Sequence, residues 1–214
     1  MQAPHLIYFA DPMCSWCYGF SPVIAAIRRE FGRSLPIRLV MGGLRPGTEE
    51  PMTPKAKAEI AGHWTHVTEA TGLPFDPAVL EPEGFVYDTD PAARAVVWMR
   101  QQDSEKALAL LARLHQAFYA QAQDVTDPQV LAGLIADAGE DGAAFLAALD
   151  SEALKHETWG DYGVSQRAGV TGFPTLVGGP GPDGTYGVVT RGYQPAEVVL
   201  PTLRAWLGAA PAEA

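Results

Sequence analysis

The sequence holds only two cysteines, Cys14 and Cys17, in 214 residues. A framework of structural disulfides is therefore excluded, and the chain suits a reducing compartment. No apolar run reaches the ~20 residues that a membrane span requires. The first residues also lack the basic segment and apolar core of a secretory leader, so Met1 is expected to be the true start. We therefore expect a cytoplasmic protein that does not enter a membrane.

Positive charge is also scarce. The chain has 15 Lys and Arg residues against 25 Asp and Glu residues, which gives a net charge of −10. The basic residues are scattered rather than gathered in a stripe, so we expect neither nucleic acid nor an anionic membrane surface as a partner. Apolar residues make up 47% of the chain, which is enough for one sizeable core or for a core with an inserted subdomain.

The two cysteines frame the segment 14–17, which reads Cys-Ser-Trp-Cys. An apolar run at 6–10 predicts a strand before this segment, and residues 23–31 predict a helix after it. The unpaired N–H groups and the positive dipole at a helix start favour a thiolate over a thiol. We therefore expect Cys14, the outer residue, to act as the nucleophile. Cys17, one turn further in, would be the resolving thiol, and no bound cofactor is needed.

Two cysteines at this spacing could instead supply two of the ligands of a zinc site. Zinc binds about four ligands, and the nearest candidates, His63 and His66, lie far along the chain. Two buried cysteines without a role are the other alternative. A pair of this spacing after a strand, in an intracellular protein, favours a redox function, so we expect no metal.

Strand and helix signals are segregated along the chain. A second strand is predicted at 35–41, and two more at 174–177 and 187–191, joined by a turn-rich connector and followed by a final helix and a frayed tail. The long stretch between carries only helix signals, which are capping residues before proline and amphipathic stripes. Helices are predicted there to begin at or near Thr53, Asp76, Asp90, Glu105, Asp127, Asp141 and Ser151. Because neither pair of strands alone covers a core, we expect all four in one sheet.

This layout resembles the DsbA-like branch of the thioredoxin superfamily. The similar features are the strand–Cys-x-x-Cys–helix opening, the helical insertion, and the segment 172–175, Gly-Phe-Pro-Thr, before a late strand. The fragment 11–19 is most similar to the cytoplasmic FrnE-type oxidoreductases. The resemblance implies an α/β fold, namely a thioredoxin-like fold with an inserted all-helical domain. The thioredoxin-like domain would be discontinuous, at 1–50 and 170–214, and the helical insertion domain would span 51–169.

The resemblance also implies a function and a binding groove. The chain would exchange thiols and disulfides with protein or peptide substrates, and Pro174 would be cis and lie beside the cysteines. Ser15, Trp16, Phe173 and Pro174 would form the substrate groove. Two features depart from the better known members: the Ser-Trp pair between the cysteines and the aromatic residue before the proline. These departures leave the redox potential and the substrate open, but not the class of reaction.

Two other functions stay open. The kappa-type glutathione transferases and the 2-hydroxychromene-2-carboxylate isomerases are similar in layout, but they usually carry Ser where Cys14 stands and bind glutathione. Glutathione is therefore a further candidate partner. A module that binds thiols or unfolded chains in the helical cleft, without turnover, is the non-enzymatic alternative.

Three further features allow two interpretations each. His63 falls on the apolar stripe of its predicted helix, where it is either structural or functional. Asp11, three residues before Cys14, either relays protons to Cys17 or caps the turn. The segment 41–44, Met-Gly-Gly-Leu, either lines the cleft at the carboxyl end of its strand or forms a plain turn.

The local charges predict an intermediate redox potential. The helix start supports a thiolate, but no cation lies between the cysteines, and the net charge of −10 opposes an anion. We expect the potential to lie between the values of thioredoxin and of disulfide isomerases, about −270 and −180 mV. A redox titration against glutathione measures it. A potential near the ~−120 mV of the most oxidising members would mean that a cation from elsewhere in the fold reaches the site.

Overall fold

The computed structural model of the chain describes residues 3–181 and 183–208, so Met1 and the tail predicted to fray, 209–214, lie outside the described residues. The strands are β1 (His5–Ala10), β2 (Ile37–Met41), β3 (Thr175–Gly179) and β4 (Gly187–Arg191). The helices are α1 (Ser15–Phe31), α2 (Pro54–Thr71), α3 (Asp90–Gln102), α4 (Ser104–Gln121), α5 (Pro128–Asp137), α6 (Gly142–Leu149), α7 (Glu152–Arg167) and α8 (Ala196–Gly208). The described chain is thus mixed α/β, as predicted.

The four strands form one sheet in the order β2-β1-β3-β4. β1 and β2 are parallel and joined by α1, whereas β3 runs antiparallel to both β1 and β4. A bulge interrupts the β3–β4 ladder between Leu176 and Val177. The prediction that the early and late strands share one sheet is confirmed, because β1 and β3 are direct neighbours.

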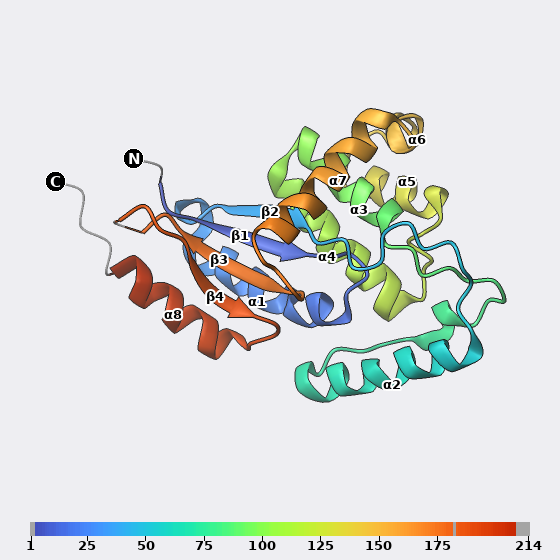
Figure 1. Cartoon of the computed structure of the whole chain (residues 1–214), viewed down its shortest axis with the longest axis horizontal. Helices are drawn as coiled ribbons and strands as arrows, with labels where there is room; N and C mark the ends of the chain where they lie inside the picture. The colour runs from blue at the N-terminus through green and yellow to red at the C-terminus, as the bar shows by residue number, and fades with distance from the viewer. Residues whose placement is uncertain (1–2, 182, 209–214) are drawn as a thin grey trace.

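The helices lie on the sheet and beyond one of its edges. Figure 1 shows α8 alongside β4, the helices from α3 to α7 gathered near β2, and α2 set apart from them. Helix α8 packs closely on the sheet, since the ring of Trp206 lies 3.1 Å from where a Cβ of Gly178 would stand. In the described part of the chain, residues 51–169 contain helices and no strand.

The core runs without a break from the sheet into the helical segment. One cluster of buried side chains joins Tyr8 of β1 and Ile27 of α1 to Val97 of α3 and Phe118 of α4. The helical segment therefore shares its apolar interior with the sheet. The division into a domain at 1–50 and 170–214 and a domain at 51–169 stays a prediction.

Local capping explains where most of the helices begin. Thr53 accepts a hydrogen bond from the N–H of Ala56 at the start of α2, and Asp127 and Ser151 cap α5 and α7 in the same way. The helix predicted after Asp76 is only a short 3₁₀ turn, Pro77–Leu80. The first helix starts earlier than its apolar periodicity indicated, at Ser15, and continues past Pro22.

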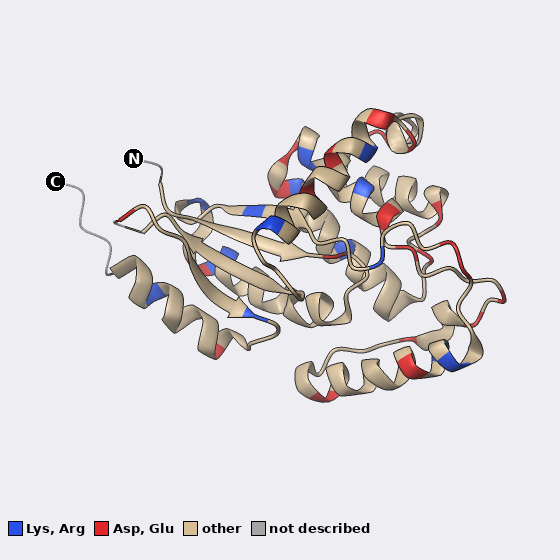
Figure 2. Cartoon of the chain, in the orientation of Figure 1, with Lys and Arg blue, Asp and Glu red and all other residues tan. Residues whose placement is uncertain are grey.

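Acidic and basic side chains are interspersed over the helices, while the sheet is largely uncharged (Figure 2). None of the helices in the described ranges is both long and apolar enough to cross a membrane.

An ion pair from the helical segment covers the free edge of β2. Arg100 of α3 donates to the carbonyl of Leu39 at 2.8 Å and to the carboxylate of Asp161 at 2.7 Å. Asp161 of α7 in turn accepts the N–H of Met41 at 2.9 Å. Edge strands leave such groups unpaired, so this pair both satisfies β2 and attaches it to α3 and α7.

We predict that Asp161→Ala lowers the free energy of unfolding by about 2–4 kcal/mol, because it leaves the Met41 N–H without an acceptor and Arg100 without its nearest counter-charge. Urea denaturation at neutral pH measures this loss. The matched control is Glu157→Ala, which removes the other, more exposed partner of Arg100 and should cost less than about 1 kcal/mol. Equal losses in the two variants would contradict the role assigned to the β2 edge.

Candidate functional site

The two cysteines lie at the junction of β1 and α1. Cys14 is the residue that caps α1, with an extended backbone, and its N–H donates to the carbonyl of Asp11 at 3.2 Å. Ser15 begins the helix and is buried, and Cys17 lies within the first turn. The N–H groups of that turn point toward the loop, so the positive end of the helix is next to the Cys14 sulfur.

The carboxylate of Asp11 holds this loop in place. One of its oxygens accepts the N–H of Met13 at 2.9 Å, and the other accepts the N–H of Leu44 at 2.8 Å. The loop before the cysteines is thereby tied to the loop that follows β2. Asp11 is fully buried, and burial raises the pKa of its carboxyl to about 6, although the two N–H groups oppose the rise.

Side chains from the helical segment hold the same loop from the other side. The Tyr87 hydroxyl donates to the carbonyl of Met13 at 2.7 Å and lies 3.2 Å from the Tyr119 hydroxyl. His115 of α4 contacts the carbonyl of Asp11 through Nε2 at 3.0 Å. A carbonyl only accepts, so Nε2 carries the proton. Burial lowers the pKa of His115 to about 4, so the ring is neutral at pH 7.

The two cysteines have different surroundings. Both are unbonded thiols in this structure. Cys14 is 6% exposed and lines a cavity, whereas Cys17 is completely buried. Burial, and then the Cys14 side chain, raise the pKa of Cys17 well above its usual value. Cys14 is therefore the outer thiol of the pair, and the order of attack stays a prediction.

Phe173 and Pro174 come next to Cys14 although they are distant in sequence. The Cys14 thiol donates to the carbonyl of Phe173 at 3.5 Å. The Phe173–Pro174 peptide bond is cis, the geometry that the resemblance implies. The ring of Phe173 lies directly over Gly42, where a Cβ would come within 2.3 Å of it. The glycine after β2 is therefore needed for close packing and is more than a turn residue.

A cavity of about 230 Å³ opens in front of Cys14. Trp16 forms part of its wall and is held between His63 of α2, at 6.0 Å between ring centres, and Tyr193, at 5.7 Å. The remaining wall comes from both parts of the chain: Met13, Ser15, Leu44, Arg45, Ile60, Trp64, Tyr87 and Phe173. The cavity is mostly apolar, with one cation, one histidine and one tyrosine, so it suits a thiol-bearing chain with an apolar neighbour.

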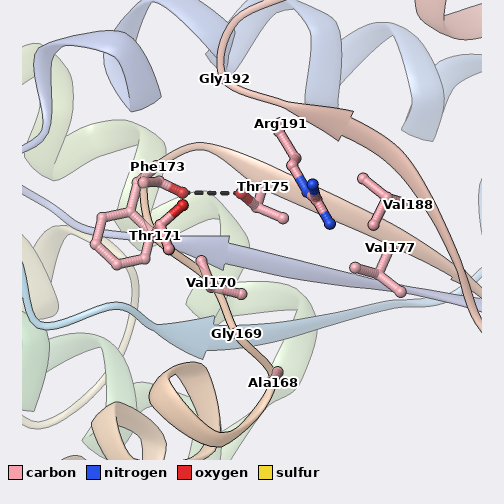
Figure 3. A pocket seen from close by; sticks show the side chains of 11 residues that line it. Ala168, Gly169, Val170, Thr171, Phe173, Thr175, Val177, Val188, Arg191 and Gly192 are labelled. Atoms are coloured by element: carbon pink, nitrogen blue, oxygen red, sulfur yellow. Dashed lines mark hydrogen bonds between the residues drawn. The ribbon is translucent and has the colours of Figure 1, made fainter.

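A second cavity, of about 160 Å³, lies on the other side of Phe173. Figure 3 shows the Arg191 side chain reaching from β4 toward Val177 and Val188, with Phe173 at the opposite end. Thr175 also lines it, and its hydroxyl donates to the carbonyl of Gly172 at 2.8 Å. Phe173 thus separates the two hollows and is the residue common to both.

The structure brings all six predicted site residues to one place and adds others. Cys14, Ser15, Trp16 and Phe173 all border the first cavity, Cys17 lies directly behind Cys14, and Pro174 follows Phe173. His63, for which a structural and a functional role were both left open, is exposed on α2 and lies against the Trp16 ring at the cavity, while the same helix buries Trp64 and Val67.

Sequence reasoning did not find Tyr8, Arg45, Tyr87, His115 or Tyr119. None of them belongs to a motif, and each reaches the site only through tertiary packing. Within the described ranges, no group of three or more His, Cys, Asp or Glu side chains is placed to hold a metal ion.

We predict that the buried Asp11 makes stability depend on pH. Its pKa is about 6 in the folded state and about 3.9 in an unfolded chain, so its contribution is fully present below pH 4 and is lost as the pH rises through 6. The stability of the reduced wild type relative to Asp11→Asn should fall by about 2 kcal/mol between pH 4 and pH 7. Urea unfolding over this range measures the difference.

An exposed carboxylate supplies the control for this measurement. Hydrogen bonds from Thr185 lower the pKa of Asp183, so the stability of the wild type relative to Asp183→Asn should change with pH in the opposite direction. If the stability difference between the wild type and Asp11→Asn did not change with pH, the pKa of Asp11 would not be raised in the folded protein.

Comparison with known proteins places this geometry in a family. A model of the DSBA-like thioredoxin domain matches residues 5–197. The structure of a candidate protein disulfide isomerase from Nitrosomonas europaea is 37% identical, with a TM-score of 0.87, and the match covers 97% of this chain and 98% of that one. The cytosolic disulfide reductase DsbM from Pseudomonas aeruginosa is 28% identical, with a TM-score of 0.79 and coverage of 96% and 100%.

Two more matches bear on partners. A second structure of DsbM, with GSH, is 27% identical with a TM-score of 0.77, and the match covers 95% of this chain and 99% of that one. Among curated proteins, the ClpXP adapter protein SpxH of Shouchella clausii is 24% identical over 214 residues, which cover 100% of this chain and 70% of that protein. The predicted thioredoxin-like fold is confirmed by the family model and by the structural matches, and the chain belongs to the family of DSBA-like thioredoxin domains.

Proposed function

We propose that this protein is a dithiol–disulfide oxidoreductase that reduces or isomerises protein and peptide disulfides through Cys14 and Cys17. The observation that carries the proposal is the asymmetry of the two thiols at one helix start. Cys14 borders a cavity and faces the carbonyl of Phe173, while Cys17 is buried behind it. The family and its disulfide-reductase relative support the reaction class.

The reaction balances with the two thiols alone. The Cys14 thiolate attacks one sulfur of a substrate disulfide, which forms a mixed disulfide at Cys14 and expels the other substrate sulfur as a thiolate. Cys17 then loses its proton and attacks the Cys14 sulfur. The Cys14–Cys17 disulfide forms, the remaining substrate sulfur leaves as a thiolate, and two electrons have passed to the substrate.

The groove around Cys14 favours an extended chain as substrate. The carbonyl of Phe173 lies beside the Cys14 sulfur and can accept a hydrogen bond from a substrate backbone. Pro174 has no N–H, so it cannot compete with the substrate as a donor. Trp16 and Ser15 would contact the residues that flank the substrate cysteine, since both border the cavity. A substrate strand that pairs at this point would gain main-chain hydrogen bonds whatever its sequence, which suits an enzyme with many protein substrates.

We further propose a cytoplasmic location, a similarity of function to the FrnE-type branch, and glutathione as the small thiol that re-reduces the pair. The cytosolic DsbM and its structure with GSH support the location and the partner. A glutathione-dependent transferase or isomerase is the second enzymatic candidate. The adapter relatives favour the third candidate, a binding module without turnover.

Three assays separate these candidates. The oxidoreductase should reduce insulin with glutathione as the electron donor and should not conjugate glutathione to an electrophilic aromatic substrate. Conjugation without insulin reduction would support the transferase. A wild-type protein that binds reduced or unfolded chains but performs neither reaction would support the binding module.

We predict that Cys14→Ser abolishes insulin reduction and forms no adduct, whereas Cys17→Ser retains a mixed disulfide at Cys14 that mass spectrometry detects. The reason is that Cys14 alone borders the cavity, so only its sulfur can reach the substrate, and only Cys17 can release it. The double variant Cys14→Ser/Cys17→Ser is the control for non-specific adducts. Faster alkylation of Cys17 than of Cys14 in the reduced wild type would reverse the assigned roles.

A further inference from the structure

The hydroxyl of Tyr8 is a buried polar group that the structure leaves without a partner. Tyr8 lies in the middle of β1 and is 1% exposed. Among the described residues, the only buried side-chain oxygen or nitrogen atoms without a hydrogen bond are its Oη and the Nε of Arg94. Arg94 is compensated by ion pairs with Asp90 and Asp150. An orphaned hydroxyl costs stability, so the case of Tyr8 calls for a functional explanation.

Tyr8 lies against the part of α1 that carries Cys17. Its ring packs 5.9 Å from the ring of Phe20. It also lines a small cavity together with Ser21 and His115. The Ser21 hydroxyl is within hydrogen-bond distance of the carbonyl of Cys17, at 3.2 Å, and of Nδ1 of His115, at 3.1 Å. Cys17 also contributes to raising the pKa of the Tyr8 hydroxyl, after burial, which is a further sign that the two groups are neighbours.

In the resting structure burial and Cys14 oppose a Cys17 thiolate, and a backbone hydrogen bond from Asp11 favours it only in part. Burial raises the pKa of Cys17, yet this sulfur must lose its proton before it can attack the mixed disulfide. His115 is neutral and its Nε2 proton is engaged with the carbonyl of Asp11. Among the described side chains of this corner, the Tyr8 hydroxyl is a donor without a partner, and burial keeps it protonated.

We propose that the Tyr8 hydroxyl donates a hydrogen bond to the Cys17 sulfur when that sulfur loses its proton, and thereby promotes release of the substrate from Cys14. The inference rests on the resolving role of Cys17 given above. The hydroxyl has no partner to give up, so a hydrogen bond to the thiolate would satisfy both groups at once. No proton is transferred from Tyr8 in this step.

The small cavity borders Tyr8, and Cys17 is not part of its wall. Its volume of about 20 Å³ is room for one water molecule. Tyr8, Ser21 and His115 are the polar groups in its wall, and the exposed Ala112 at its rim connects it to solvent.

The experiment uses dithiobis(nitrobenzoate) as the substrate disulfide. The reduced protein releases one nitrothiolate when Cys14 attacks and a second when Cys17 resolves the adduct, and both are followed by absorbance in stopped flow. We expect Tyr8→Phe to slow the second release by about 10- to 100-fold, the factor expected for loss of a hydrogen bond to a charged group. The first release should change less than about twofold, because Cys14 does not depend on Tyr8.

The pH profile of the second release separates this role from a merely structural one. The titratable groups around Cys17 are Tyr8 from β1, Asp11 from the following loop, Cys14 at the start of α1 and His115 from α4. In the adduct Cys14 is blocked, and Asp11 and His115 titrate near pH 6 and pH 4. Above pH 7 the profile therefore reports Cys17, and in Tyr8→Phe it should move to higher pH by about one unit or more.

The control variant is Tyr18→Phe. Tyr18 follows Cys17 in sequence, but its hydroxyl donates to the carbonyl of Pro74 at 3.3 Å. The variant should leave both releases unchanged. Tyr8→Phe removes an unsatisfied group, so its unfolding free energy should equal or exceed that of the wild type. A stable Tyr8→Phe protein with a normal second release at every pH would overturn the inference. A wild-type protein that releases only one equivalent would refute the resolving role of Cys17 and, with it, the proposed function.

Discussion

The antiparallel pairing of β1 with β3 is the constraint on which the site depends. Its register sets Phe9 opposite Thr175, so the end of β1 and the beginning of β3 lie at the same edge of the sheet. Cys14 follows the end of β1, and Phe173 precedes the beginning of β3. Cys14 and Phe173 therefore come into contact although they are 159 positions apart. The ring of Phe173 then fits only because residue 42 has no side chain.

Around this meeting point several polar side chains are buried. The carboxylate of Asp11, the hydroxyl of Tyr87 and the imidazole of His115 each bind a main-chain group of the loop before Cys14. Together they hold the loop rigid from three directions, which fixes the sulfur relative to the cavity. The arrangement costs stability at neutral pH, because the raised pKa of Asp11 means that its ionisation opposes folding.

Several local features were predictable because they depend on neighbours in sequence. The helix caps at Thr53, Asp127 and Ser151 follow from side chains that bind the next turn. The position of the cysteines between a strand and a helix follows from two short apolar patterns. The surroundings of His63 could not be predicted in this way, because helical periodicity indicates which residues share a face, whereas the partner that covers that face is set by the fold. In α2 the covered face is narrow and centres on Trp64 and Val67.

The sequence by itself determined the class of fold and the place of the two cysteines between a strand and a helix, since both rest on short-range patterns of apolar residues. Only the tertiary structure decided which distant side chains surround the sulfurs. Tyr8 and Tyr87 belong to no motif, and their hydroxyls acquire a role only when β1 and the helical segment pack against α1. Hydrogen bonds between residues far apart in the chain depend on the packing of the whole core, and a linear pattern carries no record of that packing.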